Sequence, residues 1–105
     1  MRKIESLMCQ AIANNQDWRL ANTKVVNTSE GYSHVYLHNN HIATVKDDTV
    51  ILYDGGWQSV TTKSRLNAIC NVFCKPGEGV FQKAYQWFVN YNGQTVPFFN
   101  GFTFA

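Results

Sequence analysis

The sequence predicts an α+β fold: an N-terminal helix, an antiparallel four-stranded meander, a second helix and a C-terminal β-hairpin. Apolar residues recur at helical spacing near the N-terminus and again after Thr62. Between these two segments the period changes to two, and Asn or Asp pairs separate the alternating stretches. With 105 residues, of which 45% are hydrophobic, the chain can bury one core but not two, so we expect a single domain over residues 1–105.

The first helix is predicted over residues 3–16, where apolar side chains recur every three or four positions. Polar residues fill the positions between them and would lie on the opposite side. Asn14 and Asn15 end the pattern. The apolar stripe consists of Ile4, Leu7, Met8, Ala11 and Ile12.

The meander follows, with Asn39-Asn40 and Asp47-Asp48 as two-residue turns, because Asn and Asp tolerate the positive φ of tight hairpins. The predicted strands are 24–27, 33–38, 42–46 and 49–53. The first turn would pair His38 with His41, Leu37 with Ile42 and Tyr36 with Ala43; the second would pair Val45 with Val50 and Ala43 with Leu52.

This register distributes apolar residues over both faces of the sheet. One face would carry Tyr36, Ala43, Val45, Val50 and Leu52, and the other Val35, Leu37, Ile42, Ile51 and Tyr53. A sheet that is apolar on both faces must be covered on both. We therefore expect the two helices, or one helix and the C-terminal segment, to enclose the meander.

The second helix is predicted over residues 63–74, with an apolar stripe of Leu66, Ile69, Cys70 and Phe73. Thr61 or Thr62 would cap its first turn. Lys75-Pro76-Gly77 would end it.

Residues 80–91 satisfy both a helical and a strand pattern, and their aromatic density favours a strand. Asn92-Gly93 is the strongest hairpin signal in the chain. It would pair Tyr91 with Gln94, Val89 with Val96 and Trp87 with Phe98, and would leave Pro97 on an edge strand.

Composition and motifs exclude several classes of protein. The formal charge of +2 permits contact with nucleic acid but is far from a dense basic surface, and no stretch is apolar enough to cross a membrane. Three cysteines and the absence of a signal sequence suggest a cytosolic protein without disulfides. No nucleophile with a base and no phosphate-binding glycine loop is recognisable, so we expect no enzymatic activity and no cofactor.

Two pairs of residues have side chains that bind metal ions, but the sequence supports a complete metal site at neither pair. His38 and His41 would face each other beside a turn, but no third or fourth ligand lies nearby. Cys70 and Cys74 are one helical turn apart, yet Cys70 belongs to the apolar stripe. We therefore expect no metal site.

The start of the second helix is the best candidate for a binding site. Helix N-termini present free N–H groups and the positive end of the helix dipole. Two cations at this end are unfavourable for the helix, and a bound anion or an acidic partner would offset their charge. The alternative interpretation is a simple cap with solvated lysine and arginine, beside a tryptophan that fills the core. The candidate residues are Trp57, Thr61, Thr62, Lys63, Ser64 and Arg65.

The sequence also resembles a family of small uncharacterised single-domain proteins encoded by tailed bacteriophages. The resemblance extends from residue 22 almost to the C-terminus, and its most specific part is Trp57-x-x-x-Thr61-Thr62-Lys63-x-Arg65-Leu66-Asn67. Asn39 and His41 depart from the pattern, which has a glycine and an apolar residue there more often. The resemblance implies a viral source and expression in the host cytoplasm, and brings no catalytic residues.

Together these observations predict a non-enzymatic phage accessory protein that binds nucleic acid or a nucleic-acid-processing complex. Lys63 and Arg65 would contact phosphates and Trp57 would stack on a base. Aromatic and basic residues also alternate in 81–87, which is a second possible stacking surface. The alternative is a protein–protein inhibitor of a host enzyme or an anti-phage defence system that uses exposed aromatic residues. The oligomeric state is not predictable from these features.

Overall fold

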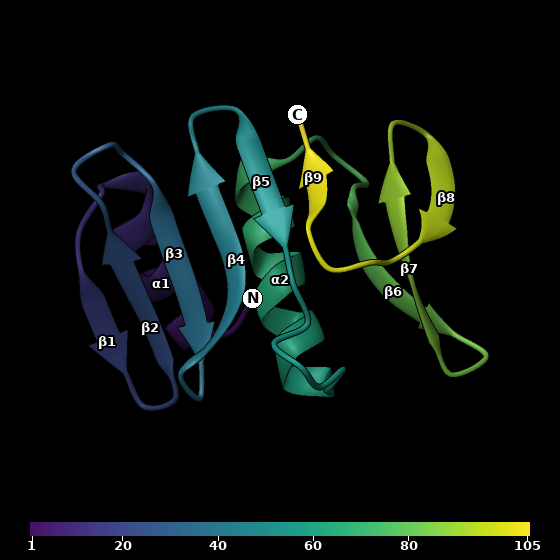
Figure 1. Cartoon of the computed structure of the whole chain (residues 1–105), viewed down its shortest axis with the longest axis horizontal. Coiled ribbons are helices and arrows are strands. Elements are labelled where there is room, and N and C mark those ends of the chain that lie inside the picture. Colours follow the sequence, from purple (N-terminus) through teal and green to yellow (C-terminus); the bar gives the residue numbers. More distant parts are fainter.

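A computed structural model describes residues 1–105 as a mixed α+β structure with two helices and antiparallel sheets (Figure 1). This confirms the predicted fold class. The helices are α1 (Lys3–Ala13) and α2 (Val60–Phe73). The strands are β1 (Trp18–Leu20), β2 (Thr23–Asn27), β3 (Ser33–Leu37), β4 (Asn40–Lys46), β5 (Thr49–Leu52), β6 (Gly79–Lys83), β7 (Gln86–Tyr91), β8 (Gln94–Pro97) and β9 (Phe102–Phe104).

The strands form two sheets, and the predicted four-stranded meander is only the centre of the larger one. That sheet has six strands in the order β1-β2-β3-β4-β5-β9, and every neighbouring pair is antiparallel. The prediction missed β1 and β9, which have three residues each and pair with the two edges of the meander. The smaller sheet has the order β6-β7-β8.

Both helices pack on the same face of the six-stranded sheet. In Figure 1 this sheet lies in front, with α1 behind β2 and β3 and α2 behind β4 and β5. The core between them is one cluster of 21 buried apolar residues that extends into the smaller sheet through Val80, Trp87 and Val89. The expectation that both faces would be covered is therefore wrong: neither helix packs on the front face.

The register of the β3–β4 hairpin explains this difference. The turn is His38-Asn39, both at positive φ, and not Asn39-Asn40. A bulge between Val35 and Tyr36 adds a second shift, so that Tyr36 pairs with His41 and Val35 pairs with Ala43. Because a one-residue shift exchanges the two faces of a strand, Val35 joins the buried face and Tyr36 the open one.

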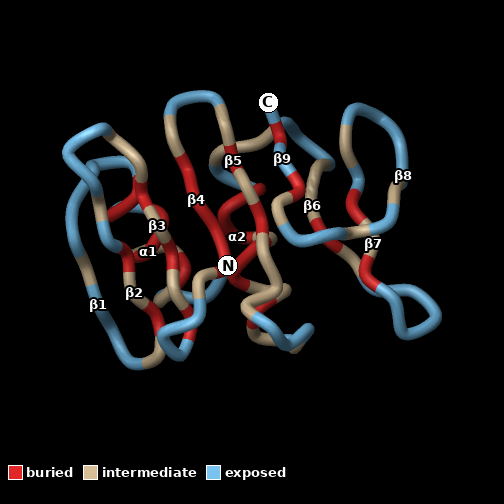
Figure 2. The backbone as a smooth tube through the Cα atoms, in the orientation of Figure 1, coloured by how far each residue is buried: buried red, intermediate tan, exposed pale blue.

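The second turn of the meander has the predicted register. Val45 pairs with Val50 and Ala43 with Leu52 across the Asp47-Asp48 turn. All four side chains are buried on the face that packs on the helices. In Figure 2, most of β4 is buried, whereas buried and intermediate residues alternate along β5.

Helix α2 begins three residues before the predicted start. Its N-cap is Ser59 and not Thr61 or Thr62, and the Ser59 hydroxyl accepts a hydrogen bond from the Thr62 backbone N–H at 3.0 Å. The predicted apolar stripe is confirmed, since Leu66, Ile69 and Cys70 are buried and Phe73 packs against the core.

Residues 80–91 are extended, as predicted, but they form two strands instead of one. Ala84 and Tyr85 adopt positive φ and make a turn between β6 and β7 that no Gly, Asn or Asp announces. The Asn92-Gly93 hairpin has the predicted register, and β8, which contains Pro97, lies at the sheet edge. Neither helix is long and apolar enough to cross a membrane.

Candidate functional site

The structure divides the predicted site at the start of α2 into an exposed part and a buried part. Trp57 is 78% exposed, and Thr61 and Lys63 are partly exposed. Thr62 and Arg65 are buried, and Ser64 is partly buried. The six residues therefore do not form one surface.

Arg65 is held in a polar network between the two helices. Its Nη1 donates to Glu5 Oε2 of α1 at 2.9 Å, and its Nε donates to Thr23 Oγ1 at 3.1 Å. The Ser64 hydroxyl donates to the same Glu5 oxygen at 2.6 Å, and Asn22 Oδ1 lies 3.4 Å from Arg65 Nη2. Burial opposes the ionisation of Glu5, but hydrogen bonds from Ser64 and Arg65 outweigh it and lower its pKa.

This network removes the reason for expecting an anion at Arg65. The residue lies in the second turn of α2, away from the helix N-terminus, and a carboxylate of the same chain already neutralises it. Lys63 is directed elsewhere, since its Nζ is 3.5 Å from Gln82 Oε1 of β6. The sequence alone could not reveal Glu5 as the partner, because 60 positions separate the two residues.

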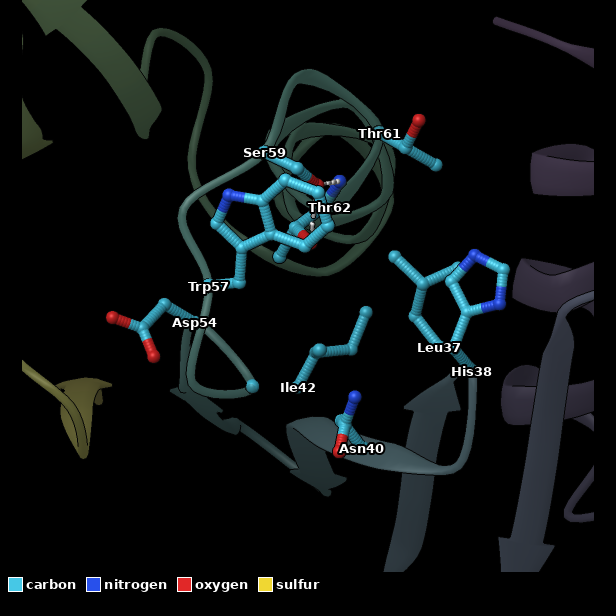
Figure 3. Close-up of a pocket in the computed structure, with 10 residues that line it drawn as sticks. Leu37, His38, Asn40, Ile42, Asp54, Trp57, Ser59, Thr61 and Thr62 are labelled. Atoms are coloured by element: carbon cyan, nitrogen blue, oxygen red, sulfur yellow. Dashed lines mark hydrogen bonds between the residues drawn. The ribbon is translucent and has the colours of Figure 1, made fainter.

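The exposed part of the predicted site borders a cavity of about 260 Å³ (Figure 3). Trp57 stands on one side and Leu37 and His38 on the opposite side, with Ile42 between them. The start of α2 closes the end of the cavity. The lining residues are Leu37, His38, Asn40, Ile42, Asp54, Gly55, Trp57, Ser59, Thr61 and Thr62.

A second feature, on the open face of the six-stranded sheet, was not predicted as a site. Here five rings touch one another across β3, β4 and the segment after β5. The centroid distances are 6.2 Å for Tyr32–His34, 5.4 Å for His34–His41, 5.5 Å for Tyr36–His41 and 4.6 Å for His41–Tyr53. We call these residues the ring row: Tyr32, His34, Tyr36, His41 and Tyr53.

Thr44 fixes the two histidines of the ring row. His34 Nδ1 and His41 Nε2 each lie 2.8 Å from the Thr44 hydroxyl. Because a hydroxyl has a single proton, it donates to one ring and accepts an N–H from the other when both are neutral. Burial is the largest influence on His41 and, together with His34, lowers its pKa, so that the neutral ring is favoured.

Positive charge borders the ring row on both sides. Lys24 Nζ lies 4.9 Å from the centroid of the Tyr36 ring, and Lys46 Nζ lies 4.3 Å from that of Tyr32. Arg19 pairs with Lys24 on the neighbouring strand and so shares the open face. The six strands of this sheet contain no Asp or Glu. The face is therefore both aromatic and cationic.

The structure contains no group of three or more His, Cys, Asp and Glu side chains that could hold a metal ion. The predicted His38–His41 partnership is wrong, since His38 lies in the turn and His41 contacts His34 instead. All three cysteines are free thiols, and Cys70 is buried in the apolar stripe of α2.

The sequence did contain a signal for the ring row. Tyr32, His34 and Tyr36 alternate with Ser33 and Val35, which is the period of a strand with one polar and aromatic face. The predicted register concealed this signal because it placed Tyr36 with the core residues. The stacking surface predicted at 81–87 lies elsewhere, on the smaller sheet.

Comparison with known protein families identifies a family to which the whole sequence is similar. The model of the family described as "Kyanoviridae Gp96 protein" matches residues 1–105. No curated protein and no solved structure matches the chain.

Proposed function

The chain belongs to the bacteriophage family described as Kyanoviridae Gp96 protein, and on that premise we propose that it binds single-stranded nucleic acid through the open face of its six-stranded sheet. It acts without catalysis in the cytoplasm of the infected host, alone or within a nucleic-acid-processing complex. The observation that carries this proposal is the ring row bordered by Arg19, Lys24 and Lys46 on strands that lack acids.

Stacking supplies the first part of the argument. Unpaired bases stack on aromatic and histidine side chains, at about 1–3 kcal/mol per base by alanine substitution. The rings of Tyr36, His41 and Tyr53 span three neighbouring segments of the sheet, so several successive bases can find a ring. Half-buried positions hold these rings in place, which limits the conformational entropy lost on binding.

Charge supplies the second part. A single strand carries a phosphate at every nucleotide, and cations beside a stacking surface follow this backbone. Lys24 and Lys46 lie at opposite ends of the ring row, over Tyr36 and Tyr32. A duplex hides the faces of its bases, so the ring row favours a single strand over a duplex.

Fluorescence anisotropy with a labelled single-stranded oligonucleotide tests the proposal over a range of salt concentrations. Binding should weaken steeply with salt, and a duplex should compete poorly. Lys24→Ala with Lys46→Ala removes two phosphate contacts and should reduce the slope of log K against log salt by about 1.4, at about 0.7 per contact.

Lys75→Ala with Lys83→Ala is the matched control, because it removes the same charge from exposed positions outside the six-stranded sheet. It should leave the slope nearly unchanged. Lys63→Ala tests the position predicted at the start of α2. Binding that is absent, insensitive to salt, or weakened equally by both double variants contradicts the proposal.

A second candidate function rests on the smaller sheet. Phe81 and Phe88 stack at 5.7 Å beside an open hollow of about 480 Å³, and Tyr85 in the adjoining turn is 93% exposed. Such aromatic surface is typical of protein interfaces and favours an inhibitor of a host protein. A pull-down from host lysate after nuclease treatment would support it if one protein is captured and Tyr85→Ala with Phe88→Ser releases it.

A further inference from the structure

A small polar hollow lies between the turn after β1 and the turn after β3, which Figure 1 shows at the lower end of the six-stranded sheet. The His38 backbone N–H donates to the Asn22 carbonyl at 2.8 Å and ties these two turns together. The volume of the hollow is about 160 Å³, which is room for roughly five water molecules at about 30 Å³ each. The lining residues are Arg19, Ala21, Asn22, Thr23, Lys24, His38 and Asn39.

Positive charge and hydrogen-bond donors dominate this lining, which contains no Asp or Glu. Arg19 and Lys24 are cross-strand partners on β1 and β2. Neither forms a salt bridge, since the only salt bridge in the structure joins Glu5 to Arg65. Arginine and lysine side chains donate hydrogen bonds and accept none. A ligand that matches this lining therefore supplies negative charge and several acceptor oxygens.

The buried network around Arg65 orients a further donor at the hollow. Asn22 Oδ1 accepts hydrogen bonds from the buried Thr23 hydroxyl at 2.8 Å and from Arg65 Nη2 at 3.4 Å. Because Arg65 only donates, the oxygen of the Asn22 amide faces the network and its nitrogen faces away. Asn22 Nδ2 has no hydrogen-bond partner in the chain, and no buried side-chain nitrogen or oxygen lacks one, so Nδ2 is open to solvent. Arg65 does not line the hollow itself but orients an amide that does.

A phosphate monoester fits the size, charge and donors of this hollow. At neutral pH it carries a charge of about −1.5 to −2 and presents three acceptor oxygens, whereas a phosphodiester inside a strand carries a single charge. Arg19 and Lys24 together balance the charge of a monoester. The planar fork of N–H donors on Arg19 can bind two phosphate oxygens at once, and Asn22 Nδ2 can reach another.

The hollow adjoins the ring row along one line of register partners. On β4, β3, β2 and the edge strand β1, this line consists of His41, Tyr36, Lys24 and Arg19. Lys24 Nζ lies 4.9 Å from the centroid of the Tyr36 ring. Stacking positions on this line therefore end at Tyr36, and the two cations of the hollow follow. A strand that stacks along the line has its last base at Tyr36 and its terminal phosphate at the cations.

We propose that this hollow holds a terminal phosphate of the bound strand, with Arg19, Lys24 and Asn22 as its donors. This site rests on the proposed function and deepens it, because it gives a general single-strand binder a preference for phosphorylated ends. The ligand chemistry is that of a phosphate monoester, which either the 5′ or the 3′ end of a strand can supply.

Fluorescence anisotropy at one salt concentration tests this preference with internally labelled strands that end in a 5′-phosphate, in a 3′-phosphate, or in hydroxyls at both ends. A hydroxyl-ended strand with one more nucleotide controls for the additional charge of the phosphate. A phosphate on at least one end should tighten binding by about 5- to 10-fold relative to both hydroxyl-ended strands. Equal affinities for all the strands overturn the terminal-phosphate site and leave the proposed function standing.

Asn22→Asp is the sharpest variant, because its carboxylate still accepts from Thr23 and Arg65 but brings negative charge to the hollow. It should remove the gain from the terminal phosphate, and so should Arg19→Ala. Arg19→Lys keeps a charge without the fork and should retain part of the gain. Lys46→Ala is the matched control, because it removes a cation at the other end of the ring row and should weaken phosphate-ended and hydroxyl-ended strands equally. A gain that survives Asn22→Asp and Arg19→Ala overturns the site.

A mononucleotide separates this site from the proposed function. Uridine 5′-monophosphate should shift the signal of the Asn22 side-chain amide in nitrogen–proton NMR spectra, and uridine should not. The same shift in a protein that binds no oligonucleotide overturns the proposed function and leaves the phosphate site standing. No shift, together with no preference for phosphorylated ends, overturns the site.

Discussion

The two faces of the six-stranded sheet are built from alternate residues of the same strands, yet they have opposite character. The inner face carries residues such as Val35, Ala43 and Leu52, which are fully buried against the helices. The open face carries the ring row and three cations. The inner face therefore supplies most of the buried apolar surface that stabilises the fold, while the open face presents the residues through which we propose that the protein binds. The predictions below test this division.

The largest effect is expected at the Glu5–Arg65 pair on the helix side of the sheet. Arg65→Met leaves the Glu5 carboxylate buried without its partner, and should lower the free energy of unfolding by about 3–5 kcal/mol in urea denaturation. On the open face, Lys24→Met should change it by only about 0.5 kcal/mol.

A double variant separates the lost charge balance from lost packing. Glu5→Gln with Arg65→Met removes both charges, and should be less destabilising than Arg65→Met alone. If Arg65→Met and Lys24→Met lower the free energy of unfolding equally, then the two faces of the sheet do not differ in their contribution to stability.

The next effect compares neighbouring residues of β5 that lie on opposite faces. Leu52 is fully buried, so Leu52→Ala leaves a cavity and should cost about 2–5 kcal/mol. Ile51 is partly exposed on the open face, and Ile51→Ala should cost about 1 kcal/mol. Thermal or urea unfolding measures both. A larger loss for Ile51→Ala would mean that the open face is covered by something that the chain itself does not supply.

The smallest effect is a two-step dependence of stability on pH. Both Glu5 and His41 have a lowered pKa in the folded protein, so each binds its proton more readily in the unfolded chain. The contribution of His41 is complete above pH 6.5, its ordinary pKa, and is lost as the pH falls toward the lower folded value. The contribution of Glu5 is complete above pH 4.5 and is lost below it.

Urea midpoints measured between pH 8 and pH 3 should therefore show the two steps in separate windows. His41→Gln should remove the upper step, and Glu5→Gln should flatten the lower one. If the His41→Gln midpoints run parallel to those of the wild type between pH 7.5 and 5, then His41 does not contribute as described.

Much of the fold followed from short-range patterns. The α2 stripe, the Asp47-Asp48 turn and the Asn92-Gly93 hairpin were predicted because each depends on residues only a few positions apart. The β3–β4 register was wrong because three adjacent residues, His38, Asn39 and Asn40, all tolerate turn geometry, and the turn used the first two. A bulge further along then shifted the pairing again, which no local pattern announced.

The candidate site divides in the same way. The sequence predicted Trp57 and Thr61 as binding residues, and the structure places both on the lining of one cavity with Leu37 and Asn40. For Arg65 the sequence-based reason was wrong. We expected its charge to require a bound anion, but Arg65 is paired with the carboxylate of Glu5, which is far away in sequence and lies on the neighbouring helix α1.

The sequence by itself determined the fold class, the positions of both helices and two of the hairpin turns, Asp47-Asp48 and Asn92-Gly93, because helical spacing and turn preferences act over a few residues. Only the tertiary structure decided which face of the sheet is open, which cation is buried, and that Trp57 borders a cavity. These properties depend on register and on contacts between distant segments. A single-residue shift reverses a strand's faces, and burial is settled only when all the elements pack together.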